Sequence, residues 1–108
     1  MLDGCWSYVL PEHRRGGTLC VKHGVVAGGN GSVTFDGISI GTASAVQIIL
    51  LAKRLPDCDP TPWGDSPEKY VVCFRGERDG QTVRGRFERS DLPDERLDAV
   101  MTYEGLAP

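Results

Sequence analysis

Residues 22–37 hold the feature that most constrains the fold, a run of glycines set among short apolar segments. The stretch reads Lys-His-Gly-Val-Val-Ala-Gly-Gly-Asn-Gly-Ser-Val-Thr-Phe-Asp-Gly. Glycine reaches positive φ without a Cβ clash, so glycines at this density mark tight turns and bulges. Reversals this close together predict a small, strongly curved antiparallel sheet and no helix. Curved sheets close into barrels, and small barrels usually bind other molecules.

Alternation of apolar and polar residues predicts further strands along the chain. We expect strands at residues 5–10, 19–22, 25–27, 33–35, 70–75, 83–88 and 97–103. Polar loops are expected over residues 11–17 and 90–95, and residues 28–31 are expected to end the third strand. His23-Gly24 predicts a compact turn, while Asp36-Gly37 and Asp79-Gly80 are strong hairpin signals.

Residues 43–54 are ambiguous, because their length and apolar content also suit a helix of three turns. The segment is rich in β-branched residues, and its apolar side chains occur on both faces of an extended strand. Thr42 or Ser44 offers a helix cap, but no acidic first turn follows. Among short turns, the segment predicts a long strand. Residues 55–67 are rich in proline and predict a loop, with Trp63 placed to cap the barrel end.

These elements predict a single all-β domain over residues 1–108, a small antiparallel up-and-down barrel of about eight strands. A chain of 108 residues that is 40% apolar fills one modest core. Short connections favour sequential antiparallel pairing, and closure removes exposed sheet edges. Two face-packed sheets remain the alternative. The residues expected to line the barrel interior are Trp6, Tyr8, Phe35, Tyr70, Val72, Phe74, Val83, Phe87, Met101 and Tyr103.

Composition and charge bear on the cellular location of the protein and on the classes of partner that it can bind. The formal net charge of -3 argues against direct binding of nucleic acid, which needs a basic face. The first residues carry no basic segment followed by a long apolar one, so no secretory signal is expected. The longest apolar run, residues 46–52, is too short to cross a bilayer. We therefore expect a cytoplasmic protein that does not contact membranes.

The four cysteines lie at positions 5, 20, 58 and 73. In the cytoplasm, reduced thiols that simply pack in the structure are the favoured expectation. A disulfide and a metal site remain alternatives, although no two cysteines have the close spacing of a zinc site.

No arrangement of residues predicts catalysis, a cofactor or a metal ion. His13 and His23 are expected at the surface, without the partner and cleft that a general base needs. The glycines of residues 28–31 precede no helix that would hold phosphate. The aspartates of the 55–67 loop lack the spacing and terminal glutamate of a calcium loop. We therefore expect a protein that is not an enzyme.

Arginines gather on two predicted neighbouring strands, at Arg75, Arg78, Arg84, Arg86 and Arg89. Acidic residues are interleaved with them, so cross-strand pairing on a solvated face is the favoured interpretation. A site for an acidic partner is the sharper alternative. Nucleic acid is less favoured, because no surface aromatic residues accompany the arginines.

Residues 46–51 carry more apolar side chains than one face of a barrel strand requires. One face takes the even-numbered residues, and Ile49 and Leu51 occupy the other. The excess predicts a covered outer face, most simply covered by a second copy of the chain. A loop or the C-terminal tail is the alternative cover. The candidate dimer interface is therefore Val46, Ile48, Ile49, Leu50 and Leu51.

Four segments of the chain resemble the GrlR-type negative regulators of type III secretion. They are Asp3-Gly4-Cys5-Trp6-Ser7, the segment from Gly17 to Asn30, Phe35-Asp36-Gly37, and the segment from Glu68 to Gly76. The resemblance implies a calycin-like (lipocalin-like) barrel that forms a homodimer. In the characterised regulator, an exposed acidic loop is important for holding a transcriptional activator, which lowers secretion-gene expression. Here residues 38–44 contain no acidic cluster, and Asn30 replaces the usual Asp.

The sequence and this resemblance together predict a non-enzymatic regulatory adaptor. It would be a homodimeric barrel that binds a partner protein, a transcriptional activator by the resemblance, as a negative regulator. The alternative is a carrier whose interior admits an apolar small molecule or lipid. Eight-stranded barrels are near the size that side chains alone can fill, so a dry core is favoured.

Overall fold

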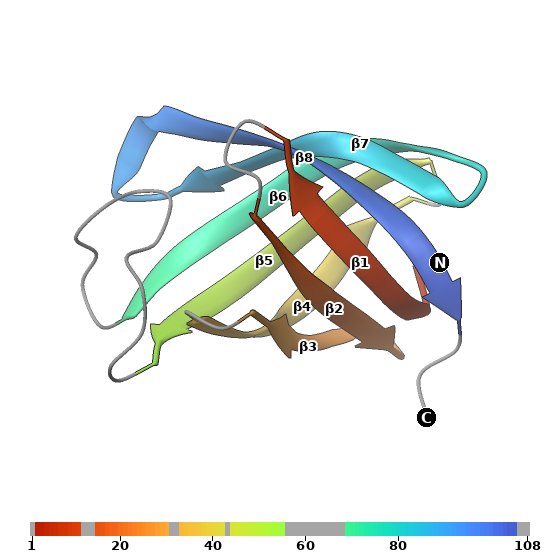
Figure 1. Ribbon diagram of the computed structural model, residues 1–108, viewed down its shortest axis with the longest axis horizontal. Coiled ribbons are helices and arrows are strands. Elements are labelled where there is room, and N and C mark those ends of the chain that lie inside the picture. The colour runs from red at the N-terminus through yellow and green to blue at the C-terminus, as the bar shows by residue number, and fades with distance from the viewer. Residues whose placement is uncertain (1, 12–14, 31–32, 43, 56–68, 106–108) are drawn as a thin grey trace.

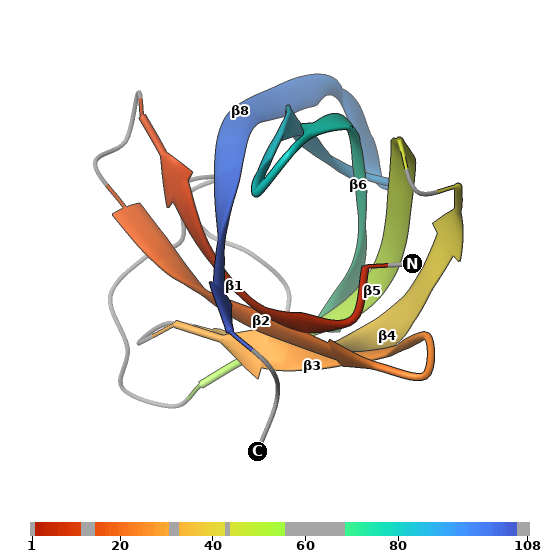
Figure 2. The same ribbon diagram turned by 90° about the vertical axis from the view of Figure 1, so that its right-hand side faces the viewer.

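The structure, a computed structural model, describes residues 2–11, 15–30, 33–42, 44–55 and 69–105. Eight antiparallel strands follow one another in sequence order and close into one barrel, in which β8 pairs with β1 (Figures 1 and 2). The strands are β1 (Gly4–Leu10), β2 (Arg15–Lys22), β3 (Val25–Gly29), β4 (Val33–Gly41), β5 (Ala45–Arg54), β6 (Lys69–Asp79), β7 (Thr82–Arg89) and β8 (Leu92–Gly105). The predicted up-and-down barrel is confirmed, and the alternative of two face-packed sheets is wrong.

Two predicted turns lie where the sequence places them. His23 and Gly24 both have positive φ, 52° and 79°, as the central residues of a type I′ hairpin turn require. Gly80 has a φ of 63° in the tight connection between Asp79 and its cross-strand partner Thr82. The ambiguous segment is also a strand, since β5 runs from Ala45 to Arg54. Residues 56–68 lie outside the described residues, so the predicted loop and the place of Trp63 stay predictions.

The predicted hairpin at Asp36-Gly37 is wrong, because β4 runs straight through both residues. A Cβ atom on Gly37 would overlap the carbonyl oxygen of Ile49 on β5. The glycine therefore allows two strands to approach closely inside the sheet, and it does not mark a reversal. The chain turns after Gly41 instead, where the Thr42 amide donates to the Ala45 carbonyl at 3.0 Å.

Two connections are shorter than the predicted loops. Gly16 and Gly17 belong to β2, and Leu10 pairs with Arg15. At the other site β8 begins at Leu92, which pairs with Arg89, so the predicted loop over residues 90–95 shrinks to a two-residue turn. Polarity misled both predictions, because strands with one solvated face carry many polar residues.

The inward-facing side chains fill the barrel. The expected interior residues are buried, with Tyr103 partly buried against the core. Further apolar side chains share this core, among them the fully buried Leu19, Ile48 and Leu50. Aromatic rings meet edge to face, with ring centroids 5.3 Å apart for Trp6 and Tyr103 and 5.4 Å apart for Tyr8 and Phe87. The core is thus a packed interior of aromatic and aliphatic side chains.

Candidate functional site

The outer surface of β3, β4, β5 and β6 carries exposed apolar side chains that lie side by side. Val25 pairs with Ile38, and Ile38 pairs with Ile49, so one row crosses three strands. A second row joins Leu51 to Val71 across β5 and β6. Large exposed apolar groups in contact with one another mark interaction sites. We call Val25, Ile38, Ile40, Ile49, Leu51 and Val71 the outer apolar patch.

Five members of the outer apolar patch are exposed, from 38% for Leu51 to 62% for Val25. Ile49 is half-buried by its neighbours. The exposed Asp36, which faces Leu51 across the sheet, marks a polar edge. The patch therefore combines a solvent-facing apolar surface with a charged border, which is the usual composition of a protein interface.

The structure divides the five candidate interface residues between the two faces of β5. Val46, Ile48 and Leu50 point into the barrel and are at most 4% exposed, so they cannot contact another chain. Only Ile49 and Leu51 lie on the outer face. Their apolar neighbours on β3, β4 and β6 were missed by the sequence analysis. These neighbours become visible only when the strand register brings Ile38 and Val71 beside β5.

A polar contact lies at the end of the barrel where the chain leaves β3. The Asn30 side-chain amide donates to the Tyr8 hydroxyl at 2.9 Å, and the Val33 amide donates to the Asn30 Oδ1 at 3.0 Å. Burial raises the pKa of the Tyr8 phenol to about 12, and the hydrogen bond from Asn30 opposes this only in part. The phenol therefore stays neutral at physiological pH and serves as a structural acceptor.

Arg89 does not lie on the solvated face where the sequence analysis placed it. It has the same strand parity as Phe87, so its side chain enters the barrel and the residue is 3% exposed. Its Nε donates to Asp91 Oδ1 at 2.9 Å, and its guanidinium lies 4.5 Å from the Tyr70 ring centroid. The pKa of the Asp91 carboxyl is lowered by this hydrogen bond. Counting parity from Phe87 would have found this arginine.

Arg78 is a second arginine that differs from the expectation. It is only partly exposed, and its guanidinium lies 5.2 Å from the Trp6 ring centroid. Its Nε donates to the Gly80 carbonyl at 2.9 Å. Since Arg78 pairs with Val83 at the start of β7 and Arg89 ends that strand, the two arginines lie towards opposite ends of the barrel.

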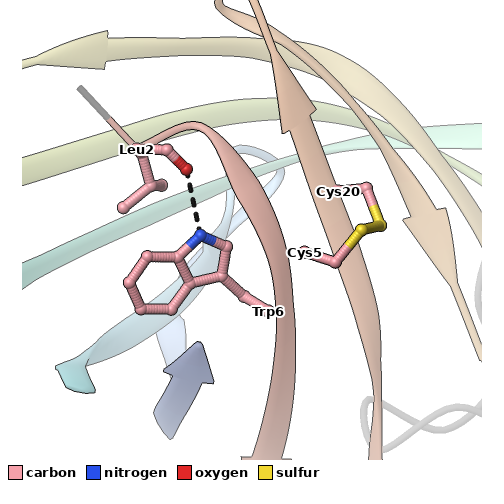
Figure 3. Close-up of a disulfide and its surroundings, with 4 residues drawn as sticks. All are labelled: Leu2, Cys5, Trp6 and Cys20. Atoms are coloured by element: carbon pink, nitrogen blue, oxygen red, sulfur yellow. Dashed lines mark hydrogen bonds between the residues drawn. A yellow bond between two sulfur atoms is a disulfide. The ribbon is translucent and has the colours of Figure 1, made fainter. Parts of the chain in front are cut away.

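Cys5 and Cys20 form a disulfide, which corrects the expectation of reduced thiols for this pair. The two residues face each other directly across β1 and β2, with Cα atoms 4.0 Å apart. Figure 3 shows the bridge on the face of β1 opposite to Trp6, whose indole donates to the Leu2 carbonyl at 3.0 Å. Spacing along the chain gave no sign of this pairing, because the strand register creates it.

The remaining candidates that the structure describes do not come together as a chemical site. Cys73 keeps a free, half-buried thiol. Within the part of the chain that the structure describes, no three potential metal ligands gather, and no helix is long and apolar enough to cross a membrane. His13, Cys58 and the aspartates of the 55–67 loop lie outside the described residues. His23 occupies the β2–β3 turn, where the sequence analysis placed it, and is exposed.

Comparison with known proteins does not assign this chain to a family. No model of a known protein family matches this chain, and no curated protein is significantly similar to it. The resemblance to the GrlR-type regulators therefore stays a prediction.

Proposed function

We propose that this barrel is a non-enzymatic regulatory adaptor that forms a homodimer and binds a partner protein. The observation that carries the proposal is the outer apolar patch. Its exposed members lie on four consecutive strands, and the strand register places Val25 opposite Ile38 and Leu51 opposite Val71. Residues along a strand normally alternate, with apolar side chains towards the core and polar side chains towards solvent. Apolar residues concentrated on the outer face therefore indicate a surface that another molecule covers.

A second copy of the chain is the occupant that fits this patch best. A two-fold interface uses the same surface on both copies, so an apolar patch meets an equally apolar patch. Stable interfaces bury about 800 Å² per partner, so a dimer would cover the outer apolar patch together with the polar side chains around it. Because aromatic and aliphatic side chains fill the interior, the outer surface of the barrel is the better candidate for binding.

The partner is proposed from the resemblance, as a transcriptional activator that the adaptor restrains. The contact surface must differ from that of the characterised regulator, because residues 38–41 lie within β4 and no acidic loop occurs there. A cytoplasmic location is part of the same proposal. The Cys5–Cys20 disulfide argues against that location, since such bridges are typical of oxidising compartments.

The alternative function, an apolar small-molecule carrier, has one observation in its favour. A pocket of about 290 Å³ lies against the start of the chain and the β4–β5 turn, and its lining includes Leu2, Val21 and Val46. This volume is at the lower limit of ligand sites. A carrier is therefore the second candidate.

Sedimentation velocity of the purified chain tests the homodimer, with Ile38→Asp and Leu51→Asp as interface variants. A buried aspartate in an apolar interface costs several kcal/mol, so we expect dimeric wild-type protein and monomeric variants. Val9→Asp is the matched control, because Val9 is 49% exposed on β1 and lies outside the outer apolar patch. A monomeric wild-type protein, or dimers in all three variants, would contradict the proposed interface.

A further inference from the structure

We propose that an open depression on the outside of β6 and β7 binds an acidic, extended segment of a partner protein. The depression has a volume of about 1050 Å³ and continues over the neighbouring edges of β5 and β8. It is next to the outer apolar patch, because Ile40 pairs with Gln47 and Gln47 pairs with Arg75 at its border. The inference rests on the proposed function only in assuming a protein partner, and not on the dimer.

The charge of this depression runs against that of the whole chain. The chain has a net charge of -3, yet five of its twelve basic residues line this one surface. Three of the described lining residues are acidic, so the formal charge balance of the described lining is 5 - 3, or +2. The arginines that face solvent are Arg75, Arg84, Arg86 and Arg96. A local positive field on an acidic protein steers negatively charged partners to that place.

The strand register places two of these arginines in an unfavourable arrangement. Arg75 on β6 lies directly opposite Arg86 on β7, and like charges in this position destabilise a sheet. Within the described residues, neither Arg75 nor Arg84 forms an ion pair. Arg86 and Arg96 share one carboxylate oxygen of Glu88 at the long distances of 3.9 and 3.8 Å. The guanidinium groups therefore keep most of their capacity for an incoming carboxylate.

Two glycines lie beneath the arginines of the depression. Gly76 and Gly85 lie opposite each other on β6 and β7, and both line the depression. They have the same strand parity as Phe74 and Phe87, so a side chain at either position would point into the barrel. A Cβ atom on Gly85 would overlap the Arg75 carbonyl oxygen, so β6 and β7 approach each other closely here. The outer face at this point is peptide backbone, bordered by the outward-facing arginine side chains.

The spacing of the arginines indicates which acidic segment fits. Arg84 and Arg86 are two residues apart on one strand, which separates them by about 6.6 Å. An extended peptide presents every second side chain on one face at the same interval. Glutamates at alternate positions would therefore meet Arg84 and Arg86 in turn, with Arg75 across the hollow. Arginine and carboxylate groups form paired, charge-assisted hydrogen bonds in this geometry.

Nucleic acid is the competing polyanion, but its chemistry fits this surface less well. Binding of single strands uses aromatic side chains on which bases stack, and none of the described residues that line the depression is aromatic. The acidic residues of the lining, including Glu77 and Glu88, also repel a continuous phosphate backbone. A peptide can place neutral residues beside them.

Fluorescence anisotropy with a labelled Ser-Glu-Ser-Glu-Ser-Glu-Ser peptide tests the inference on the full chain. We expect saturable binding that weakens with added salt, and no binding of the Ser-Gln-Ser-Gln-Ser-Gln-Ser peptide. The Arg75→Glu/Arg86→Glu variant should lose about tenfold or more in affinity. Lys53→Glu/Lys69→Glu is the matched control, because these exposed lysines also face each other across two strands and change the net charge equally. The control should retain affinity within about twofold.

Four results would overturn the inference. They are no saturable binding up to about 1 mM peptide, equal losses in the two double variants, equal binding of the glutamine peptide, and tighter binding of a single-stranded oligonucleotide than of the glutamate peptide. Circular dichroism of each variant shows that a loss of binding is not a loss of fold. Sedimentation of the same samples separates this inference from the proposed dimer. A dimer that ignores the peptide overturns only the inference, and a monomer that binds it overturns only the dimer.

Discussion

Arg75 is the residue at which the proposed binding role and stability oppose each other. It lies opposite Arg86, and a glutamate at position 75 would replace a repulsive pair with an attractive one. We expect Arg75→Glu to raise the free energy of unfolding by about 0.5 kcal/mol at low salt. The gain should largely vanish near 1 M salt, where charges are screened over about 3 Å. Urea denaturation at the two salt concentrations measures both effects.

Arg84→Glu is the control with the opposite sign. Arg84 lies opposite Glu77, so the same substitution there creates a repulsive pair of carboxylates. It should lower the free energy of unfolding by about 0.5 kcal/mol at low salt. A shift of the free energy of unfolding in the same direction in both variants would show that the cross-strand charge pairs do not determine these effects.

The Tyr8 phenol predicts how stability falls at alkaline pH. Its pKa is raised by burial from 10.0 to about 12, so the folded state holds the phenolic proton more tightly than the unfolded chain. The unfolded chain releases that proton first, and stability is therefore lost as the pH rises from about 10 towards 12. Between pH 9 and pH 11 this linkage costs about 1.3 kcal/mol.

Tyr8→Phe removes this linkage and tests its size. The variant loses the hydrogen bond from Asn30, at a cost of about 1 kcal/mol that does not depend on pH. Its free energy of unfolding should then fall less than that of the wild type between pH 9 and pH 11, by about 1.3 kcal/mol. Denaturation curves at both pH values give this difference. Parallel losses in the two proteins would show that Tyr8 titrates normally.

At the scale of the strands, the sequence predicted most of the architecture from local signals. The β-branched residues of the 43–54 segment and the short turns around it predicted the strand β5, although its length also suited a helix. His23-Gly24 predicted a compact turn, and both residues have the positive φ that a type I′ turn needs. The Asp36-Gly37 prediction failed because a glycine can either allow a hairpin turn or allow two neighbouring strands to approach closely, and here it does the second. Which purpose applies depends on the partner strand, and local sequence does not contain that information.

Gly37 therefore provides a prediction for β4. In Gly37→Ala, the new methyl group would overlap the Ile49 carbonyl oxygen. The overlapping atom belongs to the backbone of β5, so the clash cannot be relieved by rotating a side chain. We expect a loss of about 2 kcal/mol in the free energy of unfolding. Gly80→Asn is the control, since Gly80 has open space around it and asparagine tolerates positive φ. Thermal denaturation should show the control within about 0.5 kcal/mol of the wild type. A Gly37→Ala variant within about 0.5 kcal/mol of the wild type would contradict the close approach of β4 and β5 at this position.

The candidate sites required information from the whole molecule. The sequence identified Ile49 and Leu51 as an outward apolar excess, but Val25, Ile38 and Val71 join them only through the barrel register. The basic depression arises in the same way, from the opposition of Arg75 and Arg86 on neighbouring strands. Arg89 shows the reverse case, in which a charged residue leaves the surface because parity carries it inside. Surfaces of a barrel thus follow from registers between strands, which a single sequence specifies only indirectly.

The Cys5–Cys20 disulfide acts at this whole-molecule scale. It ties β1 to β2, and β1 also closes the barrel by pairing with β8. The bridge joins residues 15 apart, and the chain-entropy model predicts a stabilisation of about 3 kcal/mol for a loop of this size. Guanidinium denaturation with and without a phosphine reductant should show a loss of this order in the wild type. The Cys5→Ala/Cys20→Ala variant should match the reduced protein and ignore the reductant, whereas Cys73→Ala should respond like the wild type. Equal stability of the wild type with and without reductant would mean that the pairing of β1 with β2 and β8 alone secures the closure.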